Sequence, residues 1–344
     1  MATITLKPNK VTKKFLSVLP ERSCDVIVRR FGLGDDSNKV TLEAIGRDYG
    51  ITRERVRQIE NNAIKNIRKS DVFTNEQPIF EELKASLENL GSVVSEEDLL
   101  NYLAKKEADQ NHIHFLLVLG DSFTKEKENS QFKSRWYIDS ELSNQIHNAL
   151  NQISEKLNDD DLHPEEDMIS LFVDKAGNVN AKYKDDIDVI KRWLSISKLV
   201  GKNHFNEWGL ANSTNINAKG IRDYAYLSIR QHGSPMHFTE VAKAIEDNFG
   251  RKAHTATCHN ELIKDSRFVL VGRGLYALKE WGYASGVVRD VIKAILEKEG
   301  ALTREEIIDR VLKERYIKEN TVVVNLQDPS YFKKDTKGKY ILVA

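Results

Sequence analysis

The chain has 344 residues, and its 52 Lys and Arg side chains balance 52 Asp and Glu side chains. A chain of this length can form two or more domains with well-packed cores. The two cysteines, Cys24 and Cys258, are too few for a disulfide framework and indicate a reducing compartment. Neither a signal peptide nor a long apolar run is recognisable, so we expect a cytoplasmic protein with no membrane span.

The zero net charge hides a strong asymmetry along the chain. Residues 1–70 contain 15 basic and 8 acidic side chains, whereas residues 71–170 contain 8 basic and 22 acidic ones. A basic segment attracts phosphate and an acidic segment is repelled by it. The N-terminal segment is therefore the part that we expect to approach a nucleic acid.

The first strongly marked helix is predicted over residues 21–31. It follows Pro20 and stops before Gly32, two residue types that commonly begin and end helices. Two shorter helices with a tight turn follow within residues 41–70. Gly50 and Ile51 interrupt the helical spacing there, and Thr52 can cap the second of these helices.

In this second helix an apolar stripe runs beside a polar edge. The stripe consists of Val56, Ile59, Ala63 and Ile67. The residues that we expect to contact DNA are Thr52, Arg53, Glu54, Arg55, Arg57, Gln58 and Asn61. Arg can pair with a guanine edge and Gln with adenine, and Glu can accept from cytosine. The pattern is typical of a helix-turn-helix DNA reader. The alternative is a charged, solvated surface helix.

Residues 18–70 resemble region 4 of the bacterial sigma-70 family of RNA polymerase sigma factors. The segments LPERSCDVIVRRFGLG and TLEAIGRDYGITRERVRQIE carry the resemblance. In that family the second helix of the helix-turn-helix reads the −35 promoter element. Asn61 and Asn62 depart from the residues that are common at those positions.

The resemblance implies a role for each matching residue. Base contacts are implied for Arg53, Glu54 and Gln58, and contacts with the DNA backbone for Arg55 and Arg57. The segment 26–31 lies where the family contacts the flap of the polymerase β subunit. The residues expected to contact polymerase are therefore Val26, Ile27, Arg30 and Phe31.

From residue 77 onward a weak repeat of 60 to 70 residues is apparent, in which each copy reads as three helices followed by a β-hairpin. This arrangement is the winged-helix form of the helix-turn-helix, so we expect a mainly α fold with an N-terminal helix-turn-helix domain and tandem winged-helix units. The expected domains are 1–72, 77–140, 141–213, 217–283 and 284–344. The aromatic residues that close the copies, which we expect in the cores, are Trp136, Trp208, Tyr276 and Tyr340.

The third copy resembles the HARE-HTH domain, a winged-helix module of some RNA polymerase delta subunits and of chromatin-associated proteins. The segment 235–238, PMHF, and the turn-containing segment 272–278 carry this resemblance. It implies interaction with DNA or the transcription apparatus, without catalysis. Arg273 lies at the predicted wing tip, where it is placed to enter a minor groove.

We expect neither an enzyme nor a metal or cofactor site. His254 and Cys258 share a helix face, but no zinc-ligand motif accompanies them. The acidic residues within 159–167 have no partner at a fixed spacing, and we interpret them as a solvated loop. No nucleophile motif is present.

Three functions remain open at this point. The first is a transcription factor that reads a −35-like promoter element in double-stranded DNA and contacts RNA polymerase in initiation, in the cytoplasm at the nucleoid. The second is a DNA-binding accessory of a restriction, modification or repair system. The third is a polymerase-bound adaptor that reads no bases.

Overall fold

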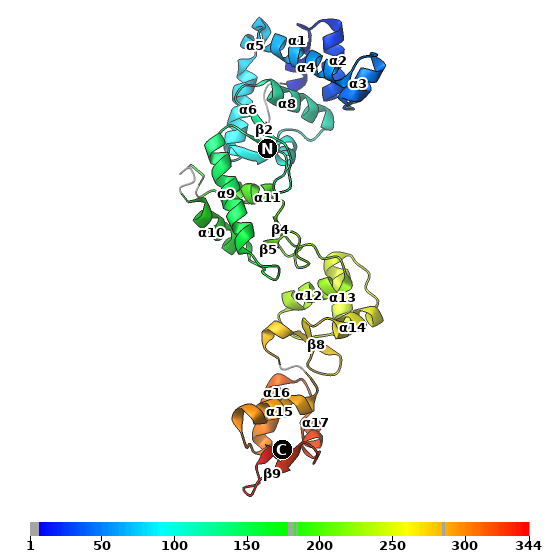
Figure 1. Ribbon diagram of the computed structural model, residues 1–344, viewed down its shortest axis with the longest axis vertical. Helices are drawn as coiled ribbons and strands as arrows, with labels where there is room; N and C mark the ends of the chain where they lie inside the picture. The colour runs from blue at the N-terminus through cyan, green and yellow to red at the C-terminus, as the bar shows by residue number, and fades with distance from the viewer. Residues whose placement is uncertain (1–6, 178–181, 184, 284–285, 344) are drawn as a thin grey trace. The chain divides into compact units, whose positions relative to one another are not determined.

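The computed structural model describes residues 7–177, 182–183, 185–283 and 286–343. The described chain is mainly helical with small antiparallel sheets, and it divides into two compact units (Figure 1). The first comprises Met1–Gly201 with Trp208–Ala211, and the second comprises Lys202–Glu207 with Asn212–Ala344. None of the described helices is both long enough and apolar enough to cross a membrane.

The first unit begins with the predicted helix-turn-helix region. Its helices are α1 (Pro8–Leu16), α2 (Glu21–Phe31), α3 (Leu42–Asp48), α4 (Arg53–Arg68) and α5 (Asp71–Asn75). The bounds of α2 are those that the sequence predicts, because Gly32 adopts a left-handed conformation with φ 65° and ends the helix. The residues before position 7 lie outside the described part of the chain.

A winged-helix arrangement follows in the same unit. Its elements are α6 (Gln77–Asn89), β1 (Val93–Ser95), α7 (Glu96–Leu103), α8 (Glu107–Leu119), β2 (Thr124–Glu126) and β3 (Arg135–Tyr137). Strand β3 lies between β1 and β2 and pairs antiparallel with both. Trp136 is buried, as its predicted role in the core requires.

The second winged-helix-like part completes the first unit. Its elements are α9 (Ser140–Lys156), α10 (Glu165–Ala176), α11 (Ile187–Ile196), β4 (Val200–Lys202) and β5 (Trp208–Leu210). Helix α11 starts at Ile187, because the Asp186 side chain accepts from the backbone N–H of Val189 at 3.1 Å and caps the helix. Tyr183 is buried, where its hydroxyl donates to the carbonyl oxygen of Glu88 at 2.9 Å.

The second unit contains the third and fourth copies. The third copy has α12 (Ile221–His232), β6 (Met236–His237), α13 (Phe238–Phe249), α14 (Thr255–Lys264), β7 (Phe268–Leu270), β8 (Leu275–Leu278) and the short 3-10 helix η1 (Lys279–Trp281). The fourth copy has α15 (Val288–Glu299), α16 (Arg304–Glu314), α17 (Glu319–Leu326), β9 (Phe332–Lys334) and β10 (Tyr340–Leu342). Both follow the predicted order of three helices and a hairpin.

Residues 211–218, which read as an open linker, form hydrogen-bonded turns. Ser213 and Asn215 are buried, and the Asn203 side chain donates to the carbonyl oxygen of Asn215 at 3.3 Å. Polar side chains in this segment bond to backbone groups, as when the Ser213 hydroxyl accepts from the backbone N–H of Asn215 at 3.1 Å.

A single apolar cluster crosses the expected boundary between residues 72 and 77. It joins side chains from α1, α2 and α4 to those of α6, α7 and α8. Phe31 of α2, for example, meets the ring of Phe115 of α8 edge-on, with ring centroids 5.0 Å apart. The helix-turn-helix region and the first winged-helix part therefore share a core. That the chain divides into five separately folding domains stays a prediction.

Candidate DNA-binding site

The turn between α3 and α4 depends on two glycines. A Cβ atom on Gly46 would lie 2.7 Å from the carbonyl oxygen of Ile51, so only glycine lets α3 approach the turn this closely. Gly50 has φ 62°, a conformation that side-chain-bearing residues rarely adopt. Thr52 then caps α4, its Oγ1 accepting from the backbone N–H of Arg55 at 3.2 Å. The sequence predicted this cap and this break.

A small apolar core fixes the direction in which α4 presents its polar side. Val26, Ile45 and Val56 are each fully buried and pack together beneath the helix-turn-helix. Ala63 and Ile67, farther along α4, are also buried. Because these residues recur at helical spacing, the opposite side of α4 faces solvent over its whole length.

The polar residues predicted to contact DNA are all exposed on this helix or its cap. They are Thr52, Arg53, Glu54, Arg55, Arg57, Gln58 and Asn61. Such a row of donors and acceptors on an exposed helix of a helix-turn-helix has the form that enters a major groove. Their contact with DNA remains a prediction.

Several of these side chains pair with one another when no ligand is present. Arg57 donates through Nε and Nη2 to the Glu54 carboxylate, at 2.8 and 2.6 Å, and Arg55 donates to Oε1 of Gln58 at 3.0 Å. The hydrogen bond from Arg57 lowers the pKa of Glu54, so that this carboxylate is charged at neutral pH. Throughout the described ranges, no hydrogen bond or ion pair involves the Arg53 side chain, and its guanidinium is therefore available.

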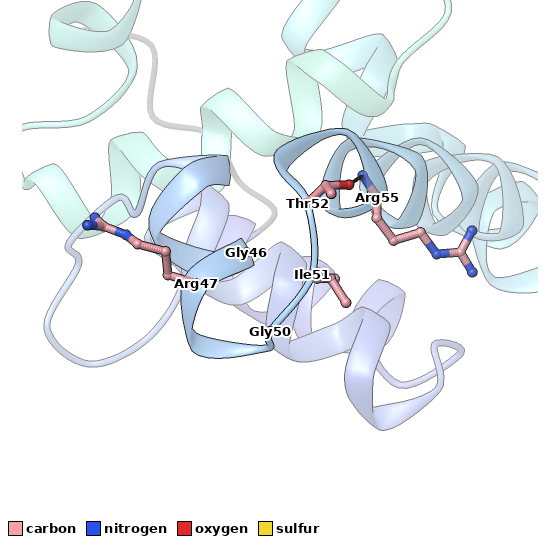
Figure 2. A pocket seen from close by; sticks show the side chains of 6 residues that line it. All are labelled: Gly46, Arg47, Gly50, Ile51, Thr52 and Arg55. Atoms are coloured by element: carbon pink, nitrogen blue, oxygen red, sulfur yellow. Dashed lines mark hydrogen bonds between the residues drawn. The ribbon is translucent and has the colours of Figure 1, made fainter.

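An open groove of about 550 Å³ lies at the turn, lined by residues of both helices. Figure 2 shows that the side chains of Arg47 and Arg55 extend away from this groove on opposite sides. Arg47 is exposed on α3, and the sequence interpretation did not include it. A signal was present, because in helix-turn-helix proteins the first helix crosses the DNA backbone and an exposed cation there can contact phosphate.

Three of the four residues expected to contact polymerase are buried, and their contact with polymerase stays a prediction. Val26, Ile27 and Phe31 are buried within the first unit, so in this structure none of them can contact a partner. Ile27 and Phe31 belong to the core shared with α8, and Val26 belongs to the core beneath α4.

Arg30 is half-buried, and it too is engaged within the unit. Its Nη1 donates to the carbonyl oxygen of Val40 at 3.4 Å, and its Nε lies 3.7 Å from Oε1 of Glu60. These contacts tie α2 to the loop before α3 and to α4. A role for Arg30 at a partner surface stays a prediction.

Arg273 belongs to the second unit, where it is exposed in the turn between β7 and β8. Gly274 beside it has φ 71°, which shapes the tight turn of the wing. The position matches the predicted wing tip, and contact with DNA is untested. Within the described ranges, no group of three or more His, Cys, Asp or Glu side chains is arranged to hold a metal ion.

Comparison with known proteins finds similarity for the helix-turn-helix part of the chain. Residues 15–69 match the family described as Sigma-70, region 4. RNA polymerase sigma factor RpoD of Helicobacter pylori is 57% identical over 53 residues, which are 15% of this chain and 8% of that protein. RNA polymerase sigma factor RpoS of Coxiella burnetii is 46% identical over 56 residues, which are 16% of each chain. RNA polymerase sigma factor SigA of Listeria monocytogenes is 49% identical over 53 residues, which are 15% of this chain and 14% of that protein.

The aligned part is thus a small share of both this chain and its relatives. It coincides with α2, α3 and α4 and includes every exposed residue of the α4 polar side named above. The match supports a DNA-binding role connected with transcription for this part of the chain, which is similar to region 4 of the sigma-70 factors.

Proposed function

We propose that the chain is a DNA-binding transcription factor that reads a −35-like promoter element with α4 and contacts RNA polymerase in transcription initiation. The observation that carries the proposal is the exposed polar side of α4, held outward by the buried residues beneath it, within the segment that matches region 4. Acting on promoters, it would work at the nucleoid.

Arg53 is the residue on which we would test base reading. It is exposed at the first position of α4, with its guanidinium available, and a forked Arg–guanine pair contributes about 1–3 kcal/mol of discrimination. We expect Arg53→Ala to weaken binding to the preferred duplex by that amount and to relax the base preference at one position.

The preferred duplex is first selected from a randomised pool by the full-length protein without polymerase. Lys69→Ala is the matched control, because it removes an exposed positive charge at the far end of α4. Equal affinity and unchanged preference for Arg53→Ala would show that α4 does not read bases. Equal losses for both variants would show that only net charge matters.

The polymerase contact rests on the similarity to proteins named RNA polymerase sigma factors. Since the apolar residues of α2 are buried, the contact would use its accessible cations, such as the exposed Arg22 and the half-buried Arg30. We expect core polymerase to co-purify with the full-length protein, and less of it with Arg22→Ala. Absence of co-purification at low salt would remove this part of the proposal and leave DNA binding intact.

The third copy is proposed to be a HARE-HTH-like winged helix that assists at DNA or at the transcription apparatus. Its predicted hairpin and helices are present, with Arg273 exposed between β7 and β8. Arg273→Ala in the full-length protein should weaken binding without altering the selected sequence, because wing residues act on backbone or minor groove. A changed sequence preference would contradict that role.

A further inference from the structure

The fourth copy has a cluster of basic side chains on one structural feature, the hairpin β9–β10 and the helix beside it. The cluster, which we call the C-terminal basic surface, consists of Arg289, Lys293, Lys333, Lys334 and Lys337. The first two come from α15 and the other three from β9 and its turn. Figure 1 shows these elements in orange and red.

Aromatic rings lie beside the cations of both groups. The guanidinium carbon of Arg289 lies 4.2 Å from the centroid of the Tyr331 ring, and Nζ of Lys293 lies 4.3 Å from it. On the hairpin, Nζ of Lys334 lies 5.2 Å from the Tyr340 ring centroid. Cation–π contacts hold cations in place while leaving their charge without a counter-ion.

The acidic residue in the turn of the hairpin, Asp335, bonds to backbone N–H groups and forms no ion pair with the lysines of the described chain. The Asp335 carboxylate accepts from the backbone N–H groups of Lys337 at 2.8 Å and of Lys339 at 2.9 Å. Gly338 follows with φ 77°, as the tight turn requires. These hydrogen bonds hold the turn together, and Lys333, Lys334 and Lys337 are exposed on it.

The four lysines of this surface are unpaired within the described chain, in contrast with other cations of the same copy. In the described part of the chain, Lys293, Lys333, Lys334 and Lys337 form no ion pair, whereas Arg310 and Lys313 are paired with nearby carboxylates at 2.6 and 2.8 Å. Arg289 approaches only Asp290, at 4.0 Å, and its Nε is buried without a hydrogen-bond acceptor. Unpaired, neighbouring positive charges repel one another, and a polyanion relieves that repulsion.

We propose that the C-terminal basic surface binds the phosphate backbone of double-stranded DNA, as a contact separate from α4. Lysines are flexible point charges that bind phosphate without requiring a shaped pocket, and contacts of this kind position a protein on DNA without reading sequence. The hairpin is the wing of a winged-helix arrangement, and a chain that also contains a region 4-like helix-turn-helix brings DNA within reach of it.

The test uses the full-length protein and a 30-base-pair duplex of arbitrary sequence, with affinity measured by fluorescence anisotropy over a range of salt concentrations. The variant Lys333→Gln/Lys334→Gln/Lys337→Gln removes up to three phosphate contacts. We expect the slope of log K against log salt to become shallower by about 2 to 3, since each contact contributes about 0.9. The matched control is Lys298→Gln/Arg304→Gln/Lys313→Gln, which removes three exposed positive charges from other faces of the same copy and should leave the slope nearly unchanged.

The corresponding Lys→Arg triple variant, which keeps the charge, should bind like the native protein. An unchanged slope for the Gln variant of the wing would overturn the proposal. An equal decrease of the slope in the control variant would also overturn it, because binding would then follow net charge alone. Loss of binding in the Arg variant would also overturn it, since the charges would not be responsible.

The same measurements in an Arg53→Ala/Arg55→Ala background separate this contact from reading by α4. If the Gln substitutions in the wing still make the slope shallower in this background, the wing and α4 contact DNA independently. A photoreactive residue is placed either at the exposed Thr336 or at Lys298. A cross-link to the duplex from position 336, and none from position 298, would locate the DNA at the hairpin. A cross-link from Lys298 alone would place the DNA elsewhere and refute the proposal.

Discussion

Residues 1–70 should not fold stably when they are cut from the rest of the first unit, because the shared core would be opened. The side chains of this segment that are buried in the shared cluster are Val11, Phe15, Leu19, Ile27, Phe31, Ala63 and Ile67. Fully burying one large apolar side chain contributes about 1.5–3 kcal/mol. For the four largest of these side chains the total is on the order of 6–12 kcal/mol, comparable with the whole stability of about 5–15 kcal/mol of a typical domain.

That total is an upper value, because the same side chains also touch one another within residues 1–70. Polar contacts are lost in addition. Asn111 donates to the carbonyl oxygens of Gly32 at 3.0 Å and Ser37 at 2.9 Å, and Arg68 donates to that of Leu119 at 3.0 Å. Each such bond contributes about 0.5–1.5 kcal/mol. Half of the contribution from apolar burial, together with the loss of these hydrogen bonds, is enough to remove most of the free energy of unfolding.

The assay compares fragments 1–70 and 1–211 by urea unfolding, followed by circular dichroism. We expect a cooperative transition for 1–211 and none, or one at very low urea, for 1–70. Phe115→Ala within fragment 1–211 should cost about 3–5 kcal/mol, since it removes the ring against Phe31. A transition of fragment 1–70 within about 1 kcal/mol of that of 1–211 would refute the shared-core argument.

Three further predictions concern stability within the first unit. Trp208→Ala should destabilise it by about 3–5 kcal/mol in urea unfolding, because the ring is buried; no measurable loss would contradict its place in the core. Gly91→Ala should cost more than an ordinary surface change, since φ is 106° and the new Cβ would lie 2.4 Å from Cγ1 of Val189; a neutral result would contradict the tight contact. Burial and the neighbouring Arg135 charge lower the pKa of His147 to about 4. As the pH falls, the unfolded chain therefore binds a proton at His147 before the folded chain does, and the free energy of unfolding should decrease by up to about 3 kcal/mol between pH 6.5 and pH 4. His147→Gln should remove that part of the pH dependence, and an unchanged profile would show that His147 does not cause it.

Much of the fold could be predicted because helix ends and helix faces are determined by residues that are close together in the sequence. Helix α2 ends at a glycine, and α4 begins at a threonine cap. The exposed side of α4 followed from the 3.6-residue spacing of its buried residues. Base-contact chemistry could be assigned to that side because the residue types restrict which base edges they can pair with.

What the sequence left open involves contacts between segments that are distant in the sequence. The apolar side chains of α2 are equally consistent with a partner surface or an internal core, and spacing alone cannot distinguish them. The core was completed by α8, about 80 residues later, through contacts such as those of Phe31 with Phe115. The contacts of Arg30 could not be predicted for a related reason, since the Val40 carbonyl and Glu60 that engage it are brought together only by the fold.

The repeated pattern of three helices and a hairpin does not give each copy the same use, and the third helix of each copy shows why. Helix α8 is apolar on nearly all sides, and its buried residues include Asn111 and His112 as well as aliphatic and aromatic side chains. A helix of this composition is buried rather than exposed to a ligand. Helix α8 packs against α1 and α2. Helix α14, at the corresponding place in the third copy, buries only Cys258 and Leu262 and exposes the remainder of a polar face. The third helix of the first copy therefore supports the helix-turn-helix from within, whereas that of the third copy leaves polar side chains exposed. It is the composition of the third helix, and not the repeat itself, that distinguishes the two uses.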